Sequence, residues 1–342
     1  MRATTREPWL GEEASEPGVP TMISRAEQRY LHWLARTQWR DEGHVVEIGP
    51  WLGGSTLCLA RGMERAHPAA RHRLHAFDNF VWRGFMARFA PLPLADGESF
   101  ERFFRANVAS QAARIEVHAR TLPDEPAPHD AEATSVRGRE APPLSPFSWD
   151  AREPLEILFV DGAKSWRGMR WLLAHVAASL TPGALLVCQD FKHWGSSWVP
   201  LFVARIAERL ELVHVVRRGS TATFRLREPL AADALAALPD DAAALAPGAA
   251  LADLEAMASW IGATGDALGA AHVRLAGVQF LSQHGAERAA LARFEEVQAA
   301  WPLRGAKGQL EDARRYLVAR GNAPGSLRVW PRLLRALSPD YS

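Results

Sequence analysis

The chain has 342 residues, of which 48% are hydrophobic and 23% charged, and its formal net charge is +1. This length allows a large buried core with a second folded part, and the composition is typical of globular proteins. The small net charge gives no electrostatic basis for binding nucleic acid or a membrane, and no apolar run is long enough to cross a bilayer. Because Cys58 and Cys188 lie in apolar runs, we expect two reduced, buried thiols in a cytoplasmic protein.

The N-terminal part of the chain changes character near residue 22. Residues 1–21 are rich in Glu, Thr and Pro and lack an apolar signal core, so we expect a flexible arm. Ser24 and Glu27 then have the spacing of a capping box, which predicts the start of a helix. A buried strand is predicted at 44–48.

A glycine-rich turn follows this strand. Its sequence is Glu47-Ile48-Gly49-Pro50-Trp51-Leu52-Gly53-Gly54-Ser55. The glycines allow a ligand to approach the backbone closely, and Ser55 is expected to cap a helix over 55–66. Free N–H groups at a helix start suit a carboxylate or phosphate, whereas the acid Glu47 favours a ligand that carries an ammonium group. S-Adenosylmethionine belongs to that class, and Trp51 is a candidate aromatic wall for its sulfonium cation.

The alternation of strands and helices continues up to about residue 226. Strands are predicted at 73–77, 115–119, 155–160, 184–188, 211–217 and 221–226, and helices at 165–180 and 198–209. This pattern predicts an α/β fold: a doubly wound, mostly parallel, Rossmann-like sheet that ends in an antiparallel hairpin. The aromatic segment 79–105 is either a mobile cover over a site or a packed loop, and 121–147 reads as an irregular surface insertion.

From residue 229 onward alanine and leucine dominate and strand signals vanish. Helices are predicted near 230–237, 250–261, 267–283, 286–300, 308–320 and 327–337. Gly285, Ala290, Phe294 and Pro302 match half of a tetratricopeptide-type hairpin, and an irregular helical cap is the alternative. We therefore predict an arm over 1–21, a cofactor-binding domain over 22–228 and a helical domain over 229–342.

Four acids are expected at the carboxyl ends of the strands, where open α/β sheets bind ligands: Glu47, Asp78, Asp161 and Asp190. Asp78, at the end of the second strand, has the position of a carboxylate that accepts both ribose hydroxyl hydrogens. Asn79 follows Asp78 directly, and we predict that it also binds the cofactor. Glu47 is expected to contact the cofactor's ammonium group, directly or through water.

Asp161, Gln189 and Asp190 supply oxygen atoms from two neighbouring strand ends, a donor set that suits Mg²⁺. Alternatively, Asp161 or His193 acts as a general base, or the two aspartates only order their loops. Lys164 lies close enough in sequence to neutralise Asp161, which would weaken a metal site. These readings stay open at the level of sequence.

The motif set resembles the class I S-adenosylmethionine-dependent methyltransferases. The glycine turn is similar to their first motif, and Asp78 to their ribose-binding acid. Phe159-Val160-Asp161-Gly162-Ala163-Lys164-Ser165-Trp166 and Gln189-Asp190-Phe191 resemble a bacterial branch of macrocin-type O-methyltransferases and cephalosporin-hydroxylase-like proteins. In the macrocin-type enzymes the matching acids bind Mg²⁺, but Gln189 stands where those enzymes have an acid.

The resemblance covers roughly residues 22–226 and implies methyl transfer to a hydroxyl of a small natural product or sugar. An alternative acceptor is an amine or hydroxyl on a peptide or carrier-bound substrate that the helical tail recognises. A third hypothesis is a cofactor-binding scaffold without catalysis. The sequence leaves open whether the chain forms a homo-oligomer.

Overall fold

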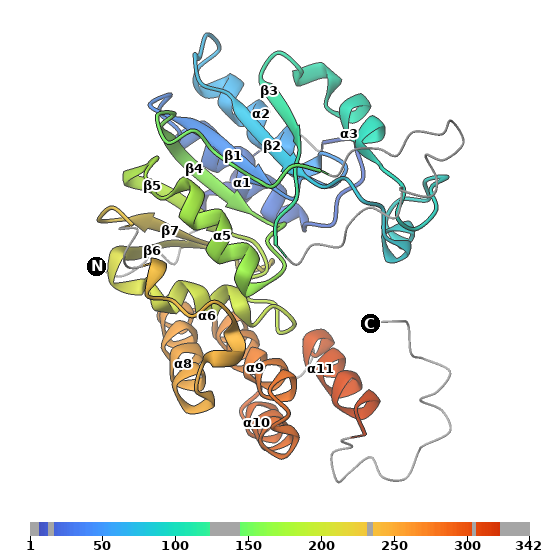
Figure 1. Cartoon of the computed structure of the whole chain (residues 1–342), viewed down its shortest axis with the longest axis vertical. Coiled ribbons are helices and arrows are strands. Elements are labelled where there is room, and N and C mark those ends of the chain that lie inside the picture. Colours follow the sequence, from blue (N-terminus) through green and yellow to red (C-terminus); the bar gives the residue numbers. More distant parts are fainter. Residues whose placement is uncertain (1–6, 13–16, 124–143, 231–234, 303–305, 322–342) are drawn as a thin grey trace. The chain divides into compact units, whose positions relative to one another are not determined.

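In the computed structural model the described residues are 7–12, 17–123, 144–230, 235–302 and 306–321 (Figure 1). Most of the predicted insertion at 121–147, part of the predicted helix at 230–237 and the predicted helix at 327–337 lie outside them. Within the described part of the chain, no helix has the length and hydropathy needed to cross a membrane.

The chain divides into two compact units, which we describe separately. The sheet unit comprises Ala3–Gln189 and Ile206–Asp241, and the helical unit comprises Asp190–Arg205 and Ala242–Ser342. The second unit therefore differs from the predicted domain 229–342, because residues 190–205 group with the helical region although they precede the last two strands.

The sheet unit contains a seven-stranded sheet with the order β3-β2-β1-β4-β5-β7-β6 (Figure 1). Its strands are β1 (His44–Ile48), β2 (Leu74–Asp78), β3 (Ile115–Ala119), β4 (Leu155–Val160), β5 (Leu180–Cys188), β6 (Leu210–Val215) and β7 (Ala222–Leu226). The strands β1 to β5 run parallel, and β7 pairs antiparallel with both β5 and β6. This topology confirms the predicted doubly wound sheet. Because β1, β2 and β4 are parallel, their carboxyl ends lie at the same end of the sheet.

Among the described residues, the sheet unit includes the helices α1 (Arg25–Thr37), α2 (Gly54–Ala66), α3 (Glu101–Asn107) and α5 (Trp166–Val176). Both hydrogen bonds of the predicted capping box are present at the start of α1. Helices α1 and α2 pack on the sheet face that carries Val45, Ala76 and Phe159. By strand alternation, Val46, His75 and Phe77 lie on the opposite face.

Three predictions of local structure are wrong. The N-terminal arm is not flexible throughout, because Trp9 in the 3₁₀-helix Pro8–Gly11 is 2% exposed and packs against Tyr30. Helix α5 ends at Val176 rather than residue 180, and β5 already begins at Leu180. Pro182 lies within β5, where the register with β4 is irregular.

The third correction concerns the start of α2. Gly53 is its N-cap residue, with a φ of 92°, and no side chain caps the helix. Ser55 therefore lies inside the first turn instead of capping it, and its hydroxyl has a different partner, described below.

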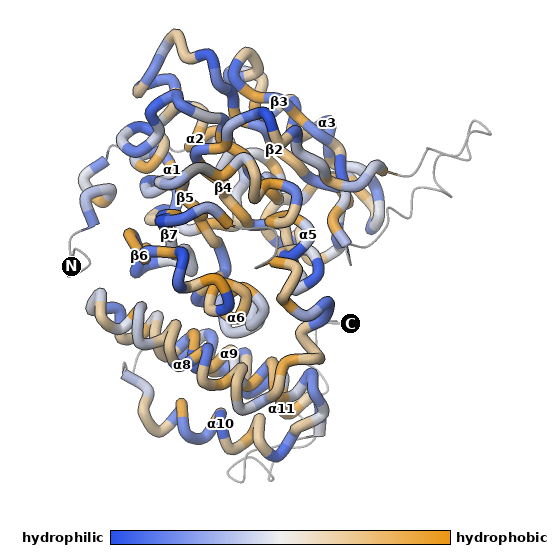
Figure 2. Tube along the Cα trace, turned by 60° about the vertical axis from the view of Figure 1, so that its left-hand side comes forward, coloured by the Kyte–Doolittle hydropathy of each residue, from blue (hydrophilic) through white to orange (hydrophobic). Residues whose placement is uncertain are grey.

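The helical unit contains α6 (Trp198–Arg205), α8 (Pro247–Ala263), α9 (Ala267–Gln283), α10 (Glu287–Ala299) and α11 (Gly308–Ala319). Helix α9 contacts α8, α10 and α11, and residues at the hydrophobic end of the scale predominate along α8 and α9 (Figure 2). Ala290 and Phe294 are fully buried, as a helical hairpin requires. The tetratricopeptide-like character itself stays a prediction.

Candidate cofactor site at the strand ends

The glycines of the turn after β1 are required by contacts within the protein. Gly49 has a φ of 84°, and a Cβ on it would lie 2.6 Å from the backbone of Gly162. A Cβ on Gly53 would lie 2.6 Å from Val108 Cγ1, and one on Gly54 would lie 2.6 Å from Thr21 Cβ. The turn is thus held against β4, α3 and the segment before α1, so its backbone is fixed before any ligand arrives.

Glu47 lies beneath this turn and has no exposed surface. Ser55 Oγ donates to its Oε1 at 2.5 Å, and Thr56 Oγ1 donates to its Oε2 at 2.7 Å. Burial, together with the charges of nearby Asp161 and Asp78, raises the pKa of Glu47 to about 7. The two hydroxyl hydrogen bonds act in the opposite direction. The structure therefore places Glu47 and Ser55 as a brace between β1 and α2, with both carboxylate oxygens occupied.

Asp78 stands at the carboxyl end of β2 and is half-buried. Its Oδ1 accepts from the backbone N–H of Phe80 at 2.7 Å, and its Oδ2 accepts from that of Trp51 at 3.4 Å. Burial raises its pKa to about 6, opposed by these hydrogen bonds and by the charge of Lys164. At neutral pH the carboxylate is mostly ionised and oriented, with lone pairs left for further donors.

Asn79 and Trp51 shape the surroundings of Asp78. The Asn79 Oδ1 accepts from the Val81 N–H at 3.1 Å, which fixes the turn after β2. Trp51 has a left-handed φ of 46° and is 7% exposed, and its indole Nε1 has no hydrogen-bond partner among the described residues. Its ring centroid lies 6.3 Å from that of Phe89, so an aromatic surface borders the turn.

The segment 79–105 is for the most part a packed loop. Phe80, Trp82 and Phe100 are each 1% exposed, and Val81 bridges to Ser99. The 3₁₀-helix Gly84–Arg88 is the exception within it: Phe85 is 53% exposed and the adjoining Phe89 42% exposed, with the Arg88 guanidinium stacked near both rings.

Asp161 and Gln189 follow β4 and β5, whose last residues Val160 and Cys188 are paired. Lys164 Nζ lies 3.1 Å from Asp161 Oδ1. The Gln189 side chain donates its Nε2–H to Ser220 Oγ at 3.0 Å, while its Oε1 is buried without a hydrogen-bond partner among the described residues. Carboxylate and amide oxygens at two neighbouring strand ends are suitable donors for a hard cation.

Asp190 and His193 belong to the helical unit and lie in the segment that follows β5. Asp190 has a left-handed φ of 62°. The Nδ1 of His193 accepts from the Gly195 N–H at 3.2 Å, so a neutral ring carries its proton on Nε2. This arrangement presents a donor rather than a base, and it disfavours His193 as the group that takes a proton.

This same segment is anchored by residues that sequence reasoning missed. Lys192 Nζ lies 2.6 Å from Asp266 Oδ2, and both side chains are at most 5% exposed. Asp266 also caps α9 through the Gly269 N–H. Two glutamines complete the anchor: Gln279 accepts from Ser197 N–H and donates to the Gly195 carbonyl, and Gln309 accepts from Trp194 N–H.

The sequence offers one signal for this anchor, since Lys192 stands between the apolar Phe191 and Trp194 and is itself 1% exposed. A buried lysine needs a buried acid, and only the fold supplies it.

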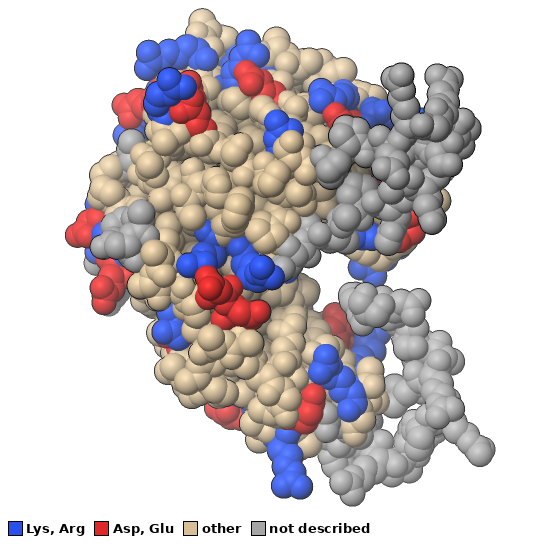
Figure 3. Space-filling model, in the orientation of Figure 1, with Lys and Arg blue, Asp and Glu red and all other residues tan. Residues whose placement is uncertain are grey.

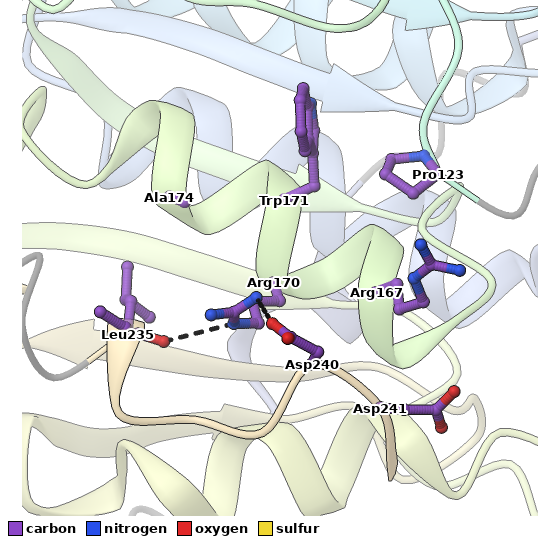
Figure 4. A pocket seen from close by; sticks show the side chains of 9 residues that line it. Pro123, Arg167, Arg170, Trp171, Ala174, Leu235, Asp240 and Asp241 are labelled. Carbon is purple, nitrogen blue, oxygen red and sulfur yellow. Dashed lines mark hydrogen bonds and ion pairs between the residues drawn. The ribbon is translucent and has the colours of Figure 1, made fainter. Parts of the chain in front are cut away.

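A separate pocket of about 590 Å³ lies along α5 (Figure 4). It is lined by Pro123, Arg167, Arg170, Trp171, Ala174, Leu235, Ala236, Asp240 and Asp241. Arg170 donates to the Asp240 carboxylate at 2.5 Å, as Figure 4 shows. These lining residues include none of the predicted cofactor or catalytic residues, so this pocket is distinct from the strand-end site.

Charge is mixed over the molecular face seen in Figure 3, where basic and acidic side chains are interspersed. At the strand ends the balance is acidic: Asp78 and Asp161 act on Glu47 electrostatically, and Lys164 is the cation that the structure places beside Asp161 and near Asp78. Three acids around one edge suit a cationic ligand.

Residues 46–191 match a family of sequences described as "Methyltransferase domain". Among curated proteins, none matches the chain. The match covers β1 to the end of β5 and confirms the resemblance to methyltransferases, with the glycine turn and Asp78 inside the matched segment.

Solved structures of O-methyltransferases are also similar. NovP shares 16% identity, over 65% of this chain and 89% of NovP, with a TM-score of 0.42. CalS11, a TDP-rhamnose 3′-O-methyltransferase of calicheamicin biosynthesis, shares 13% identity over 58% of this chain and 78% of its own, with a TM-score of 0.39. An O-methyltransferase from Bacillus cereus in complex with SAH shares 16% identity over 60% of this chain and 82% of its own, with a TM-score of 0.36. At these low scores the likenesses alone establish neither a shared fold nor a shared acceptor.

Proposed function

We propose that this chain, a class I S-adenosylmethionine-dependent methyltransferase by its domain over residues 46–191, methylates a hydroxyl group of a small natural product or sugar. The observation that carries the proposal is the strand-end cluster of Glu47, Asp78 and Asp161, in which Asp78 is held by two backbone N–H groups. A fixed carboxylate at the second strand end suits the two ribose hydroxyls of the cofactor.

The residues divide the work of binding and proton transfer. Asp78 would accept from the ribose hydroxyls, the backbone of the glycine turn would hold the methionine portion, and the Trp51 ring would border the sulfonium. The negative charge at the strand ends favours the cationic cofactor over its neutral product. When bound, the cofactor would supply a methyl group for in-line transfer to the acceptor oxygen with loss of S-adenosylhomocysteine, and the residues of the chain would contribute chiefly by orientation.

The acceptor's proton leaves to a base, and Asp161 is our assignment for it. Its carboxylate is 21% exposed and lies at the strand-end cluster, whereas the lone pair of His193 on Nδ1 is taken by Gly195. The adjacent Lys164 ammonium donates to Asp161 Oδ1 at 3.1 Å and orients this carboxylate.

As the alternative role for Asp161, we propose that it holds Mg²⁺ together with Gln189. The orphaned Gln189 Oε1 fits the group, because an amide oxygen is an acceptable Mg²⁺ ligand even where an acid is replaced. When bound, the ion would lower the pKa of a coordinated acceptor hydroxyl. Lys164, 3.1 Å from Asp161, would have to move aside or pair with the acceptor.

The test is an activity assay on the full chain with S-adenosylmethionine and matched hydroxyl and amine acceptors, followed by detection of S-adenosylhomocysteine and the methylated product. We expect product from hydroxyl acceptors, and a kcat about 100-fold or more lower for Asp161→Asn with the affinity for the neutral product S-adenosylhomocysteine unchanged. Asp150→Asn, an exposed acid in the same unit, is the matched control.

Product from amines alone would overturn the hydroxyl assignment. Unchanged turnover after chelation with EDTA, with no gain on adding Mg²⁺, would overturn the metal proposal but leave Asp161 as base. Full activity of Asp161→Asn would overturn the assignment of the base.

A further inference from the structure

A cluster of histidines lies on β1, β2 and β3, away from the residues assigned to methyl transfer. His75 on β2 pairs in register with Glu116 on β3, and Phe77 pairs with His118. His75 also pairs with Val46, two residues beyond His44 on β1. Because paired residues of neighbouring strands point to the same face, His44, His75, Glu116 and His118 share one face of the sheet.

The distances within the cluster fit two or more ligands on one ion. His75 Nδ1 lies 3.1 Å from His118 Nε2 and 3.6 Å from Glu116 Oε2. Ligand atoms at the corners of a tetrahedron, each about 2.0–2.1 Å from Zn²⁺, are separated by about 3.3 Å. The three donor atoms all lie within 4.8 Å of one another.

The hydrogen bonds around His44 determine which nitrogen of His75 is free to bind. The Arg73 backbone N–H donates to His44 Nδ1 at 3.2 Å, so this nitrogen is an acceptor. His75 Nε2, 2.9 Å from the same atom, must therefore carry a hydrogen and donate to it. A neutral His75 then directs the lone pair of Nδ1 toward His118 Nε2, which donates to it, so His118 has to move its hydrogen to Nδ1 before both nitrogens can bind one ion.

A second layer of residues contacts the proposed ligands and holds them in place. His44 Nε2, which bears the hydrogen of the neutral ring, lies 3.2 Å from Glu153 Oε2. A ligating histidine commonly donates its other N–H to such a partner, and the chain from His75 through His44 to Glu153 supplies one. The Trp149 ring, 4.9 Å from that of His75, and the Phe77 ring, 4.3 Å from that of His118, hold the imidazoles in place.

We propose that His75, Glu116 and His118 form a Zn²⁺ site that ties the edge strand β3 to β2. Two imidazoles and one carboxylate are a donor set that favours Zn²⁺ over Mg²⁺, and three protein ligands leave a fourth position for water. Glu116 is 41% exposed and lies 3.4 Å from Arg73 Nη1, a surface ion pair that costs little to exchange for the metal.

The test is calorimetric titration of the chelator-treated full chain with Zn²⁺, in excess Mg²⁺ to occupy sites made of oxygen ligands. We expect one equivalent of Zn²⁺ on the wild type, and at least tenfold weaker binding for His118→Gln and for Glu116→Gln. Because Glu116 is partly exposed, its substitution leaves folding intact. Glu153→Ala, which removes the acceptor for His44 Nε2 and no proposed ligand, is expected to weaken binding by roughly 10-fold.

His175→Gln is the matched control, since this histidine lies on α5 outside the cluster. Co²⁺ in place of Zn²⁺ gives an independent readout, because ligation by imidazole produces visible d–d absorption that the cluster variants should lose. Binding that is unchanged in both His118→Gln and Glu116→Gln, or weakened as much in His175→Gln, would show adventitious binding only and overturn the site. The outcome is independent of methyl transfer.

Discussion

At the scale of single residues, Glu47 shows how burial changes a role assigned from sequence. Its position at the strand end predicted a contact with the cofactor's ammonium group, yet both of its oxygens accept from hydroxyls of α2. The partner Thr56 is fully buried, so the three side chains form a closed unit inside the protein. The contact with the cofactor stays a prediction. The observed hydrogen bonds from Ser55 and Thr56 brace the turn between β1 and α2.

This buried acid predicts a specific dependence of stability on pH. An ordinary glutamate has a pKa of 4.5, and burial raises that of Glu47 to about 7 in the folded chain. Between these values the native state holds a proton that the unfolded state has lost, so stability falls as pH rises through this window. The difference of about 2.5 units corresponds to roughly 3 kcal/mol.

Glu47→Gln, which cannot ionise, should lack this loss. Its free energy of unfolding relative to wild type is expected to rise by roughly 3 kcal/mol between pH 4.5 and pH 8, as measured by urea denaturation. The exposed Glu208→Gln is the control. A difference between Glu47→Gln and wild type that does not change with pH would contradict the raised pKa.

At the scale of elements, the turn between β1 and α2 is specified by packing as much as by ligand chemistry. Sequence reasoning assigned its glycines to a close approach of the cofactor. In the structure the missing side chain of Gly49 faces Gly162 at the end of β4, so the two strand ends meet backbone to backbone. The close contact between Gly49 and Gly162 thus sets the position of both the turn and Asp161, which directly precedes Gly162.

Gly49→Ala should therefore cost more than the backbone conformation alone. Gly49 and Gly183 both have a positive φ, 84° and 94°, but a Cβ on Gly183 would meet nothing within 4 Å. We expect Gly183→Ala to destabilise by about 1–2 kcal/mol and Gly49→Ala by about 1–3 kcal/mol more, in urea denaturation. Equal losses would mean that the contact with Gly162 relaxes at no cost.

The segment after β5 depends on a buried ion pair in the helical unit. Asp266→Asn keeps an acceptor for capping α9 but leaves the Lys192 ammonium buried without a counter-charge, which we expect to cost about 3 kcal/mol. Adding Lys192→Met should recover most of that loss. Asp312→Asn, in an exposed pair with Arg315, should cost less than about 0.5 kcal/mol.

Denaturant unfolding of the three variants distinguishes the outcomes. If the double variant is no more stable than Asp266→Asn, the unpaired charge is not the cause of the loss.

At the scale of the whole molecule, periodic patterns predicted the elements well and contacts between distant residues poorly. The order of strands and helices, the capping box at Ser24 and the hairpin of β6 and β7 follow from local signals, and the structure confirms them. The grouping of residues 190–205 with the helical unit does not follow, because this segment meets Asp266, Gln279 and Gln309 only after folding.

Predictions for the candidate site also succeeded where they rested on local sequence and failed where they depended on side-chain contacts. The sequence predicted which acids stand at the strand ends, since each directly follows an apolar strand. It could not predict that Gln189 Oε1 lacks a partner, or that the Nδ1 of His193 is occupied, because these depend on single rotamers. The acceptor also stays undetermined, because the pocket along α5 involves none of the predicted residues.

The central claim is that Asp78 holds the ribose of an S-adenosylmethionine-type cofactor, and calorimetric titration with S-adenosylhomocysteine tests it most directly. We predict one binding site on the full chain at pH 7.5, affinity about 10- to 100-fold weaker in Asp78→Asn, and no change in the control Asp150→Asn. Affinity should also fall as pH decreases through about 6, where Asp78 takes up a proton. The account is contradicted if the wild type does not bind, or if Asp78→Asn binds as tightly as the wild type.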